Sequence, residues 1–285
     1  MAGAGAGAYA ADLALALRLA DAADEVTLAR FRAADLTVSA KPDLTPVTDV
    51  DLAIERLVRD TLAQQRPADD VLGEEYGDGS RGAPPDHTRP ARAGRCWIVD
   101  PIDGTKNYVR GVPVWATLIA LVADGRVVLG VASAPALGRR WWAAAGQGAW
   151  CTEPATAGPR RLRVSAVAEL GDASFSYSDD RGWDVRGAEP GLAQLIRTCW
   201  RTRAYGDFWS HVLVAEGAVD LAAEPELSPW DVAALIPIVE EAGGTIGGYD
   251  GTSYGGDPDA LGRAGTLTSN GLLHAAAVRV LDSGS

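Results

Sequence analysis

Hydrophobic residues near the start of the chain recur at mostly helical spacing. Between residues 10 and 31 they predict one long amphipathic helix. A second helix is expected at about residues 49–65, after a loop that contains two prolines. It follows Thr48, and Asp51 stands three residues further on, which is the spacing of a capping box. The first 65 residues are therefore expected to be mainly helical.

Continuous apolar runs farther along the chain predict buried strands. Residues 71–73 form a short run that ends at Glu74, and residues 96–99 form a fully apolar run that stops at Asp100. Both carboxylates would therefore stand at strand ends. The other strands of this half are expected at residues 35–41, 117–122, 127–132, 139–145 and 148–151. Residues 78–94 are rich in Gly, Pro and Arg, which predicts a mobile surface loop.

The chain is expected to divide into two halves near residue 165, because the sequence turns polar around residues 154–161. Beyond that point strands alternate with helices, which indicates an α/β layer. The strands are expected at residues 173–177, 201–205 and 218–223, and the helices at residues 191–200, 208–216 and 230–242. The predicted organisation is a disordered tail at 1–8, an N-terminal α+β half at 9–165 with most candidate metal ligands, and a C-terminal α/β half at 166–285 with the candidate substrate-selecting residues.

The net charge limits what the protein can bind. The chain has 285 residues, with 38 acidic against 26 basic side chains and a formal net charge of −12. It has no basic run or stripe, so we expect no nucleic-acid partner. An acidic protein repels phosphate groups at long range, so a phosphate site in it needs local cations. The charge therefore favours bound metal wherever phosphate is handled.

Cysteine usage and the start of the chain indicate a cytoplasmic protein. Cys96, Cys151 and Cys199 are odd in number and far apart, which fits neither a disulfide framework nor a zinc site. Residues 1–8 are an Ala-Gly repeat that lacks the basic and apolar segments of a signal peptide. No run approaches the roughly 20 apolar residues needed to cross a bilayer, so we expect no membrane partner.

Asp100 and Asp103 form the most informative pair in the sequence. They flank Pro101 and Ile102 at the expected end of a buried strand. Two carboxylates repel by roughly 4 kcal/mol at about 4 Å if the effective dielectric constant is about 20, so one must be protonated or a cation must lie between them. Hard oxygen ligands suit Mg²⁺. The Ile102 carbonyl is a further candidate ligand, because Pro101 makes the turn rigid.

Gly104 and Thr105 follow directly, at an expected helix start. Free N–H groups at a helix start bind anions such as phosphate, and metals beside such a cradle are the parts of two-metal phosphoryl hydrolysis. The alternative is a capped strand-to-helix turn with solvated aspartates. Glu74 taken alone fits a surface glutamate, and Asp231 taken alone fits an acidic residue at a helix N-terminus. Asp51 could likewise do no more than complete its capping box.

Three segments match, in order and spacing, the signatures of the inositol monophosphatase-like phosphatases. They are Gly73-Glu74-Glu75, Trp97-Ile-Val-Asp-Pro-Ile-Asp-Gly-Thr105 with Asn107, and Trp230-Asp231-Val-Ala-Ala234. The resemblance extends over nearly the whole chain after the tail, and its central motif is long and specific. It implies an α/β (α+β layered) protein with the five-layer αβαβα sandwich of the inositol monophosphatase and fructose-1,6-bisphosphatase type. It also implies a Mg²⁺-dependent phosphomonoesterase and a homodimer.

The resemblance assigns ligands and catalytic groups residue by residue, with two or three Mg²⁺ ions per site. The implied metal ligands are Glu74, Asp100, the Ile102 carbonyl, Asp103, Asp231 and, for a third and weaker ion, Glu74 with Asp51. The implied catalytic residues are Glu74, Thr105 and Asp103. Gly104 and Thr105 would bind the phosphate through backbone N–H groups. The Thr105 hydroxyl and Glu74 would orient the attacking water, which a metal makes more acidic.

Substrate selection is expected in the second half of the chain. Glu224 lies seven residues before Asp231, where inositol monophosphatases place a glutamate that binds a sugar hydroxyl. Asp207 stands where those enzymes tend to have a small residue, and an added carboxylate there would favour a cationic substrate. Asp207 also fits an N-cap for the helix that follows it. Further candidates for the substrate pocket are Arg203, Tyr205 and Asn107.

Residues 41–48, 103–113 and 203–208 look most like the histidinol-phosphate phosphatases of this superfamily. Histidinol phosphate carries an ammonium and an imidazole, which would give Asp207 and Glu224 partners. The expected reaction converts L-histidinol phosphate and water to L-histidinol and phosphate, late in histidine biosynthesis. The alternatives are inositol-1-monophosphatase or another small-molecule phosphatase of the same fold, and a catalytically silent regulatory or interaction protein. His211 stands on an expected helix, and its expected role is structural.

Overall fold

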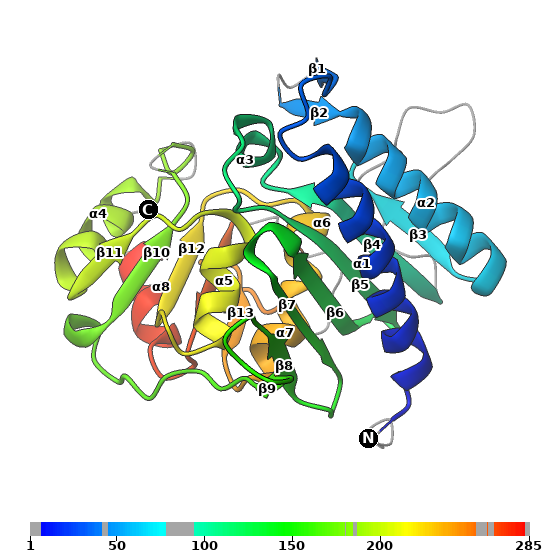
Figure 1. Cartoon of the computed structure of the whole chain (residues 1–285). Coiled ribbons are helices and arrows are strands. Elements are labelled where there is room, and N and C mark those ends of the chain that lie inside the picture. The colour runs from blue at the N-terminus through cyan, green and yellow to red at the C-terminus, as the bar shows by residue number, and fades with distance from the viewer. Residues whose placement is uncertain are drawn as a thin grey trace.

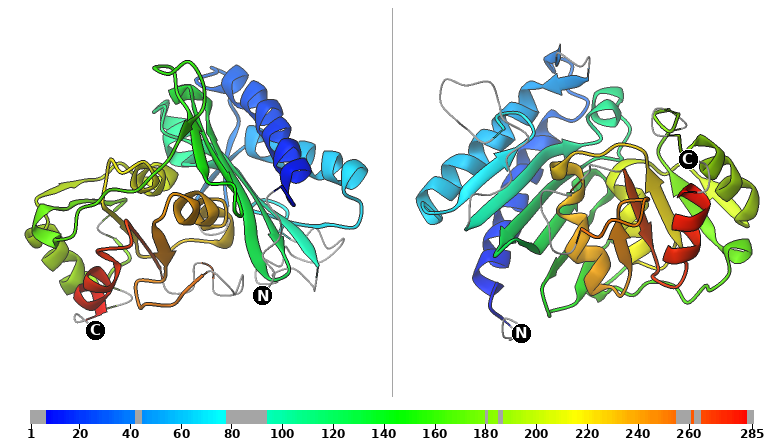
Figure 2. Two further views of the ribbon diagram at one scale, coloured as in Figure 1. Left: turned by 90° about the horizontal axis from the view of Figure 1, so that it is seen from below. Right: turned by 180° about the vertical axis from the view of Figure 1, so that it is seen from behind.

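The computed structural model describes residues 7–41, 45–77, 94–179, 181–184, 187–254, 261 and 265–282. Among these residues, helices and sheets alternate in layers, which Figure 2 shows from below and from behind. Most of the expected tail at residues 1–8 and of the expected loop at residues 78–94 lies outside the described residues.

Two long helices form the first outer layer (Figure 1). They are α1 (Ala10–Arg30) and α2 (Asp49–Gln65), and between them run the paired strands β1 (Val38–Ala40) and β2 (Pro46–Thr48). The predicted capping box is confirmed, because Asp51 Oδ2 accepts from the Thr48 backbone N–H at 2.8 Å and Thr48 Oγ1 accepts from the Asp51 N–H at 3.4 Å. Apolar residues on both helices, such as Leu15 and Ile54, share one buried core with the adjacent sheet.

The second layer is a seven-stranded sheet in the order β3-β4-β5-β6-β7-β8-β9. Its strands are β3 (Asp70–Gly73), β4 (Arg95–Asp103), β5 (Ala116–Ala123), β6 (Arg126–Ala134), β7 (Arg139–Ala144), β8 (Ala149–Thr152) and β9 (Arg160–Arg161). β3 and β4 are parallel, and the other neighbours are antiparallel. The carboxyl ends of β3 and β4 therefore meet at one edge of the sheet.

The prediction that the buried strand stops at Asp100 is wrong. β4 continues to Asp103, with an irregular register against β5 between these two residues. β4 uses Pro101 and Ile102 where β5 uses only Thr117, which is the arrangement of a β-bulge. Pro101 has no N–H to give to the sheet, and the Thr117 hydroxyl donates to its carbonyl at 2.8 Å. The sheet therefore extends into the segment that carries both aspartates.

Three helices form the central layer between the two larger sheets. They are α5 (Asp207–Ala215), α6 (Pro229–Val232) and α7 (Leu235–Glu241). The single helix predicted at residues 230–242 is wrong, because the chain breaks between α6 and α7. Pro237 explains the break: its nitrogen has no hydrogen to donate to the Ala233 carbonyl, and its ring crowds that group.

The fourth layer is a five-stranded sheet in the order β11-β10-β12-β14-β13. Its strands are β10 (Ser174–Tyr177), β11 (Arg201–Arg203), β12 (Leu221–Glu224), β13 (Thr245–Gly247) and β14 (Thr266–Ser269). The fifth layer consists of α4 (Glu189–Thr198) and α8 (His274–Asp282), which pack on this sheet around Phe175 and Leu195. Short 3-10 helices stand at Pro135–Leu137 and Leu170–Asp172. The expected αβαβα sandwich is confirmed.

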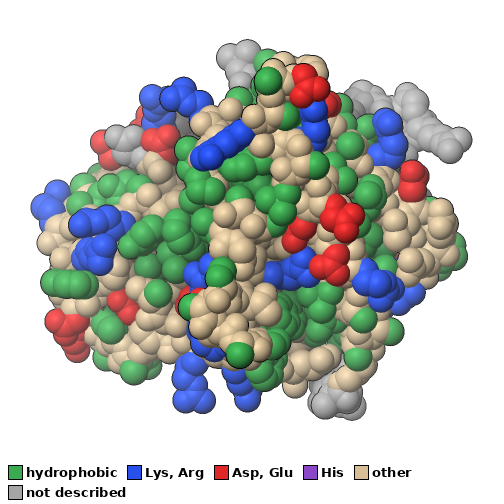
Figure 3. All heavy atoms as spheres, viewed as in Figure 1, with side chains coloured by type: hydrophobic (Ala, Val, Ile, Leu, Met, Phe, Trp, Pro, Cys, Tyr) green, Lys and Arg blue, Asp and Glu red, His purple; other side chains and the backbone are tan. Residues whose placement is uncertain are grey.

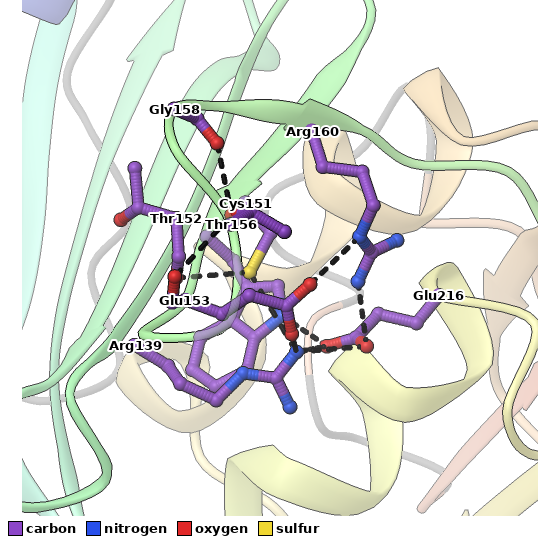
Figure 4. A network of polar contacts seen from close by, with 9 residues as sticks. Arg139, Cys151, Thr152, Glu153, Thr156, Gly158, Arg160 and Glu216 are labelled. Carbon is purple, nitrogen blue, oxygen red and sulfur yellow. Dashed lines mark hydrogen bonds and ion pairs between the residues drawn. The ribbon is translucent and has the colours of Figure 1, made fainter.

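A network of ion pairs joins the first sheet to the central layer (Figure 4). Glu216, the C-cap of α5, accepts from Arg139 at 2.8 Å and from Arg160 at 3.1 Å. The indole N–H of Trp141 donates to the same carboxylate at 2.6 Å, and Glu153 pairs with both arginines. Only 7% of the Glu216 side chain is exposed. The network therefore fixes the C-terminal end of α5 against β7 and β9.

Basic and acidic side chains are interspersed on the face shown in Figure 3, where no continuous basic stripe is visible. The acidic side chains of α1 include Asp21 and Asp24, which both pair with Arg140. Within the described part of the chain, no helix combines the length and the apolar character needed to cross a membrane.

Candidate active site

Three carboxylates from two distant segments meet where β4 ends. Asp100 and Asp103 lie on the last residues of β4, and Asp231 is the third residue of α6. One ligand atom from each lies within 4.8 Å of the others. A capping box fixes Asp231, because its Oδ2 accepts from the Ser228 backbone N–H at 2.7 Å. The fold therefore brings together Asp100 and Asp103, which were predicted from their position at a strand end, and Asp231, which was predicted only from the family resemblance.

Asp100 and Asp103 are buried and Asp231 is half-buried, which suits a bound cation. Burial raises the pKa of Asp100 well above its usual range, and the charges of Glu74, Asp103 and Asp231 raise it further. Burial also raises the pKa of Asp231 to about 7. In the part of the chain that the structure describes, Asp100 Oδ1 is buried without a hydrogen-bond partner. An unpaired buried oxygen beside further carboxylates fits a hard divalent cation, so this cluster can hold a metal ion.

Asp103 connects the cluster to the central helices. Its Oδ2 accepts from the Phe208 backbone N–H of α5 at 2.8 Å. Burial raises the pKa of Asp103 well above its usual range, and the neighbouring charges of Asp207 and Asp231 act in the same direction. A carboxylate from the first sheet is thus oriented by a helix from the second half of the chain.

Glu74 lies in the turn after β3 and lines the same cleft. Its Oε1 accepts from Lys41 Nζ at 2.6 Å, and Lys41 also pairs with Glu75 at 2.7 Å. Burial alone would lower the pKa of Lys41, but Glu74 and Glu75 raise it above its usual value. The structure thus places the Lys41 ammonium between these two carboxylates.

Glu55 shapes the turn that presents Glu74. It is fully buried on α2 and accepts from the backbone N–H groups of Glu75 at 2.7 Å and Tyr76 at 3.1 Å. Arg59 holds the same carboxylate at 2.8 Å. The turn after β3 is therefore fixed by buried side chains of the neighbouring helix.

Gly104 and Thr105 stand between the acidic cluster and the short helix α3 (Thr105–Arg110). Gly104 has a φ of 84°, and a Cβ there would lie 3.0 Å from the Val114 carbonyl oxygen, so this position requires glycine. The Thr105 hydroxyl donates to the Ile102 carbonyl at 2.9 Å. Both residues line the cleft, as the phosphate-binding prediction requires, but their contact with phosphate stays a prediction.

The structure is compatible with both roles predicted for Asp51, in the capping box and in a third metal site. Its Oδ2 belongs to the capping box, whereas its Oδ1 is buried and has no hydrogen-bond partner among the described residues. Burial raises the pKa of Asp51 to about 6, and the charge of Glu74 contributes to the increase. The capping role is confirmed, and the role in a third metal site stays a prediction.

The cleft has two adjoining parts that share Thr45, Lys106, Asp207, Ser228 and Asp231. The part next to Glu74 has a volume of about 570 Å³. The part next to Glu224 has a volume of about 770 Å³. The acidic cluster thus opens toward a second compartment that is large enough for the alcohol side of a small phosphate ester.

Asp207 faces this second compartment, and its N-cap interpretation is wrong. Gly206 occupies the N-cap position of α5, and Asp207 is the first helical residue, with a φ of 49°. Its Oδ2 instead accepts from Asn107 Nδ2 at 2.8 Å. Burial raises the pKa of Asp207 to about 6, with a further contribution from the charge of Glu224.

Glu224 ends β12, lines the same second compartment and is 5% exposed. Its Oε2 accepts from the Ser178 hydroxyl at 2.8 Å. Tyr205 and Asn107 also line this compartment. Arg203 is exposed on β11, donates to the Thr202 carbonyl at 2.7 Å and is absent from the described lining of either part.

Several residues that line the cleft were not predicted from the sequence. Lys106 lines both parts, and its place directly after the Gly104-Thr105 pair was a usable signal. Other lining residues gave no local signal, because they enter from remote elements; they are Ser178, Glu226, Leu227 and His211.

Comparison with known proteins assigns the chain. Residues 10–283 match the inositol monophosphatase family. The chain belongs to this family. A histidinol-phosphatase from Mycobacterium tuberculosis is 54% identical over 96% of this chain and 98% of its own length. A histidinol-phosphatase from Streptomyces coelicolor is 52% identical over 93% of this chain and 95% of its own length.

Solved structures of the inositol monophosphatase family confirm the architecture. An inositol monophosphatase from Zymomonas mobilis superposes with a TM-score of 0.80 at 29% identity, covering 96% of this chain and 99% of the other. Family membership makes the chain an enzyme, a phosphoric monoester hydrolase. The expectation of a phosphatase of this fold is thereby confirmed.

Proposed function

We propose that the protein hydrolyses L-histidinol phosphate to L-histidinol and phosphate, with Mg²⁺, as a step of histidine biosynthesis in the cytoplasm. The histidinol-phosphatase names of the two relatives at 52% and 54% identity support the substrate. The observation that carries the proposal within the structure is a pair of carboxylates in the second compartment, the half-buried Asp207 and the buried Glu224. In the described part of the chain, neither forms an ion pair with a lysine or an arginine.

The acidic cluster is where Mg²⁺ would be held. Asp100, Asp103 and Asp231 would be ligands, and Glu74 and the Ile102 carbonyl would complete the set, for two or three ions per site. The chemistry supplied by bound Mg²⁺ is charge compensation for the phosphoryl oxygens and a more acidic attacking water. The fit rests on the unpaired buried Oδ1 of Asp100 and on the mutual repulsion of its neighbours.

Side chains and backbone groups of the protein would orient the water and bind the substrate. The Thr105 hydroxyl and the Glu74 carboxylate would orient the attacking water, and the backbone N–H groups of Gly104 and Thr105 would bind the phosphate. Asp207 and Glu224 would receive the ammonium and imidazole of the alcohol, because charge-assisted hydrogen bonds to a cation are about twice as strong as neutral ones. The substrate would thus span both parts of the cleft.

Replacing Asp207 tests this assignment. Asp207→Ala should raise KM for histidinol phosphate by about tenfold or more, because the cationic group loses a charged partner. The same change should leave KM for inositol 1-phosphate, whose alcohol is uncharged, nearly unaltered. Equal losses on both esters would contradict cation recognition, and Asp100→Asn should abolish activity on both.

An inositol-1-monophosphatase is the second candidate. Glu224 stands at the position where inositol monophosphatases hold a sugar hydroxyl, and this carboxylate does line the second compartment. Asp207 argues against a neutral polyol, because a polyol would leave this half-buried carboxylate without a cationic group of the substrate to bind. A catalytically silent regulatory protein is disfavoured by the presence of all four metal carboxylates and Thr105.

The assembly implied by the resemblance is a homodimer. We propose that the protein forms this homodimer, which light scattering coupled to size-exclusion chromatography tests. A mass near twice 29.7 kDa is expected.

A further inference from the structure

His211 and Glu224 form a buried pair that the proposed reaction leaves unexplained. His211 is 1% exposed on α5, and Glu224 is 5% exposed at the end of β12. His211 Nε2 lies 3.5 Å from Glu224 Oε1. Among the described residues, both atoms are buried without a hydrogen bond. Leaving two such groups unsatisfied is costly, so their juxtaposition calls for a function.

The other nitrogen of His211 is already occupied. Nδ1 lies 2.7 Å from the Thr268 hydroxyl of β14. β12 and β14 are antiparallel neighbours in which Ala222 pairs with Thr268 and Glu224 pairs with Thr266. Ala222 and Glu224 are two residues apart and therefore point to the same face of the sheet, as does Thr268 opposite Ala222. That face packs against α5, so Thr268, His211 and Glu224 follow one another in one layer.

Electrostatics distinguishes the two neutral tautomers of His211. If Nδ1 carried the proton, the lone pair of Nε2 would face the Glu224 carboxylate, and two acceptors would repel. If Thr268 donates to Nδ1, the proton stands on Nε2 and points at Glu224 Oε1. The second arrangement gives the buried carboxylate oxygen the donor that no other described side chain offers it. The Ser178 hydroxyl holds the other oxygen at 2.8 Å.

We propose that His211 is a positioning residue, which orients Glu224 for the cationic alcohol of the substrate while Thr268 fixes its tautomer. The inference rests on the proposed function for the identity of that alcohol. His211 itself does not touch the reacting phosphate. It donates to one oxygen of Glu224, Ser178 donates to the other, and the carboxylate is oriented before substrate binds.

Two amides separate this role from simple packing. His211→Gln places an amide N–H where Nε2 stands, whereas His211→Asn places its amide near Nδ1, within reach of Thr268 only. We expect His211→Asn to raise KM for histidinol phosphate by about tenfold with little change in kcat, and His211→Gln to raise it by less than about threefold. Neither variant should change KM for inositol 1-phosphate as much. Identical effects of the two variants, or equal losses on both esters, would overturn the proposal.

A spectroscopic measurement keeps the test independent of the substrate. The chain has three histidines, so the ring nitrogens can be assigned by ¹⁵N NMR of the whole protein with single-histidine variants. We expect His211 to carry its proton on Nε2, and Glu224→Gln to shift the Nε2 signal while Nδ1 keeps its bond to Thr268. The role of His211 would be refuted if its proton were on Nδ1. It would also be refuted if Glu224→Gln left the Nε2 signal unchanged. Preference of the unmodified enzyme for inositol 1-phosphate would instead refute the proposed function.

Discussion

At the residue scale, Asp207 combines an uncommon backbone conformation with a half-buried carboxyl group. Its φ of 49° lies in the left-handed region, which residues other than glycine rarely adopt. Such a conformation costs on the order of 1 kcal/mol or more and persists where the surroundings hold it. Here Asn107 binds its carboxylate, and Gly104 leaves room for it, since a Cβ at Gly104 would stand 3.3 Å from Asp207 Oδ2. The strain and the burial both concentrate at the position proposed to recognise the substrate.

The raised pKa of Asp207 predicts a pH-dependent contribution to binding. With a pKa of about 6, the side chain is mostly protonated at lower pH and charged at higher pH. The KM of Asp207→Asn for histidinol phosphate, divided by that of the unmodified enzyme, should be near one at about pH 5 and reach about ten at about pH 8. Taking the ratio removes the ionisation of the substrate itself.

The matched control for this experiment is inositol 1-phosphate, for which the KM ratio should stay near one at both pH values. A ratio for histidinol phosphate that is constant across the titration would show that the charge of Asp207 does not act on the substrate.

Some residues of the candidate site could be predicted from the sequence, whereas their hydrogen-bond partners could not. Asp100 and Asp103 were predicted because two carboxylates at one strand end stand close in any fold. The partners of Asp207 and Glu224 could not be predicted, because Asn107 is 100 residues from Asp207 and Ser178 is 46 residues from Glu224. Such contacts depend on packing between layers, which local patterns do not encode.

At the element scale, the turn after β3 depends on close packing against α2. A Cβ on Gly73 would collide with the carboxylate of Glu55, which holds the N–H groups of the turn. Gly73→Ala should therefore displace Glu55, misplace Glu74 and lower Mg²⁺-dependent kcat/KM by about tenfold or more. Gly171→Ala is a suitable control, because a Cβ there meets nothing within 4 Å. Equal activity of both variants would contradict the role given to Glu55.

The ion-pair network around Glu216 predicts a stability effect without a change in chemistry (Figure 4). Glu216→Gln should lower the free energy of unfolding by about 1–3 kcal/mol, because Arg139 and Arg160 lose a buried countercharge while Glu153 remains. Urea unfolding measures the loss. The control is Asp21→Asn, whose side chain is 64% exposed in its pair with Arg140 and should contribute less than about 0.5 kcal/mol. A similar small effect for both would show that the network is not stabilising.

Elements were predicted well where one local rule dominates. The boundaries of α2 follow from its capping box and apolar period, and the structure reproduces them at Asp49–Gln65. The prediction failed where two rules compete. Apolar periodicity favoured one helix at 230–242, but the missing N–H of Pro237 divides it. At β4, the rule that carboxylates end a strand competed with a bulge that lets the sheet continue through Asp103.

At the scale of the whole molecule, the fold brings buried acidic groups from both halves into one cleft. The layered architecture could be predicted only through motif resemblance, because strand order and layer contacts have no local signature. The central layer also shows that the two halves share packing, since α7 contacts β6 of the first sheet and β13 of the second. The division near residue 165 stays a prediction about sequence composition.

The buried carboxyl groups predict how stability changes with pH and Mg²⁺. Several of them have a raised pKa in the folded protein, among them Asp51 and Asp207 at about 6, and Glu75 and Asp231 at about 7. A raised folded pKa means that their contribution is full below the unfolded value near 4 and is lost as pH rises through 6 to 7. The metal-free protein should therefore become less stable over that interval.

Mg²⁺ should restore this loss, because the ion competes with protons for the same oxygens. The rise in Tm on adding Mg²⁺ should be larger at about pH 8 than at about pH 5, reaching roughly 5–10 °C at about one hundred times Kd. Asp231→Asn should show a smaller rise near pH 8. If adding Mg²⁺ left Tm unchanged at both pH values, the result would argue against the metal site.

The most direct test of the account is the ratio of kcat/KM for L-histidinol phosphate to that for inositol 1-phosphate, measured with Mg²⁺ under identical conditions. The two carboxylates of the second compartment, Asp207 and Glu224, predict a ratio of at least about ten in favour of histidinol phosphate. A ratio below one would contradict the account, since it would show that the second compartment selects a neutral polyol.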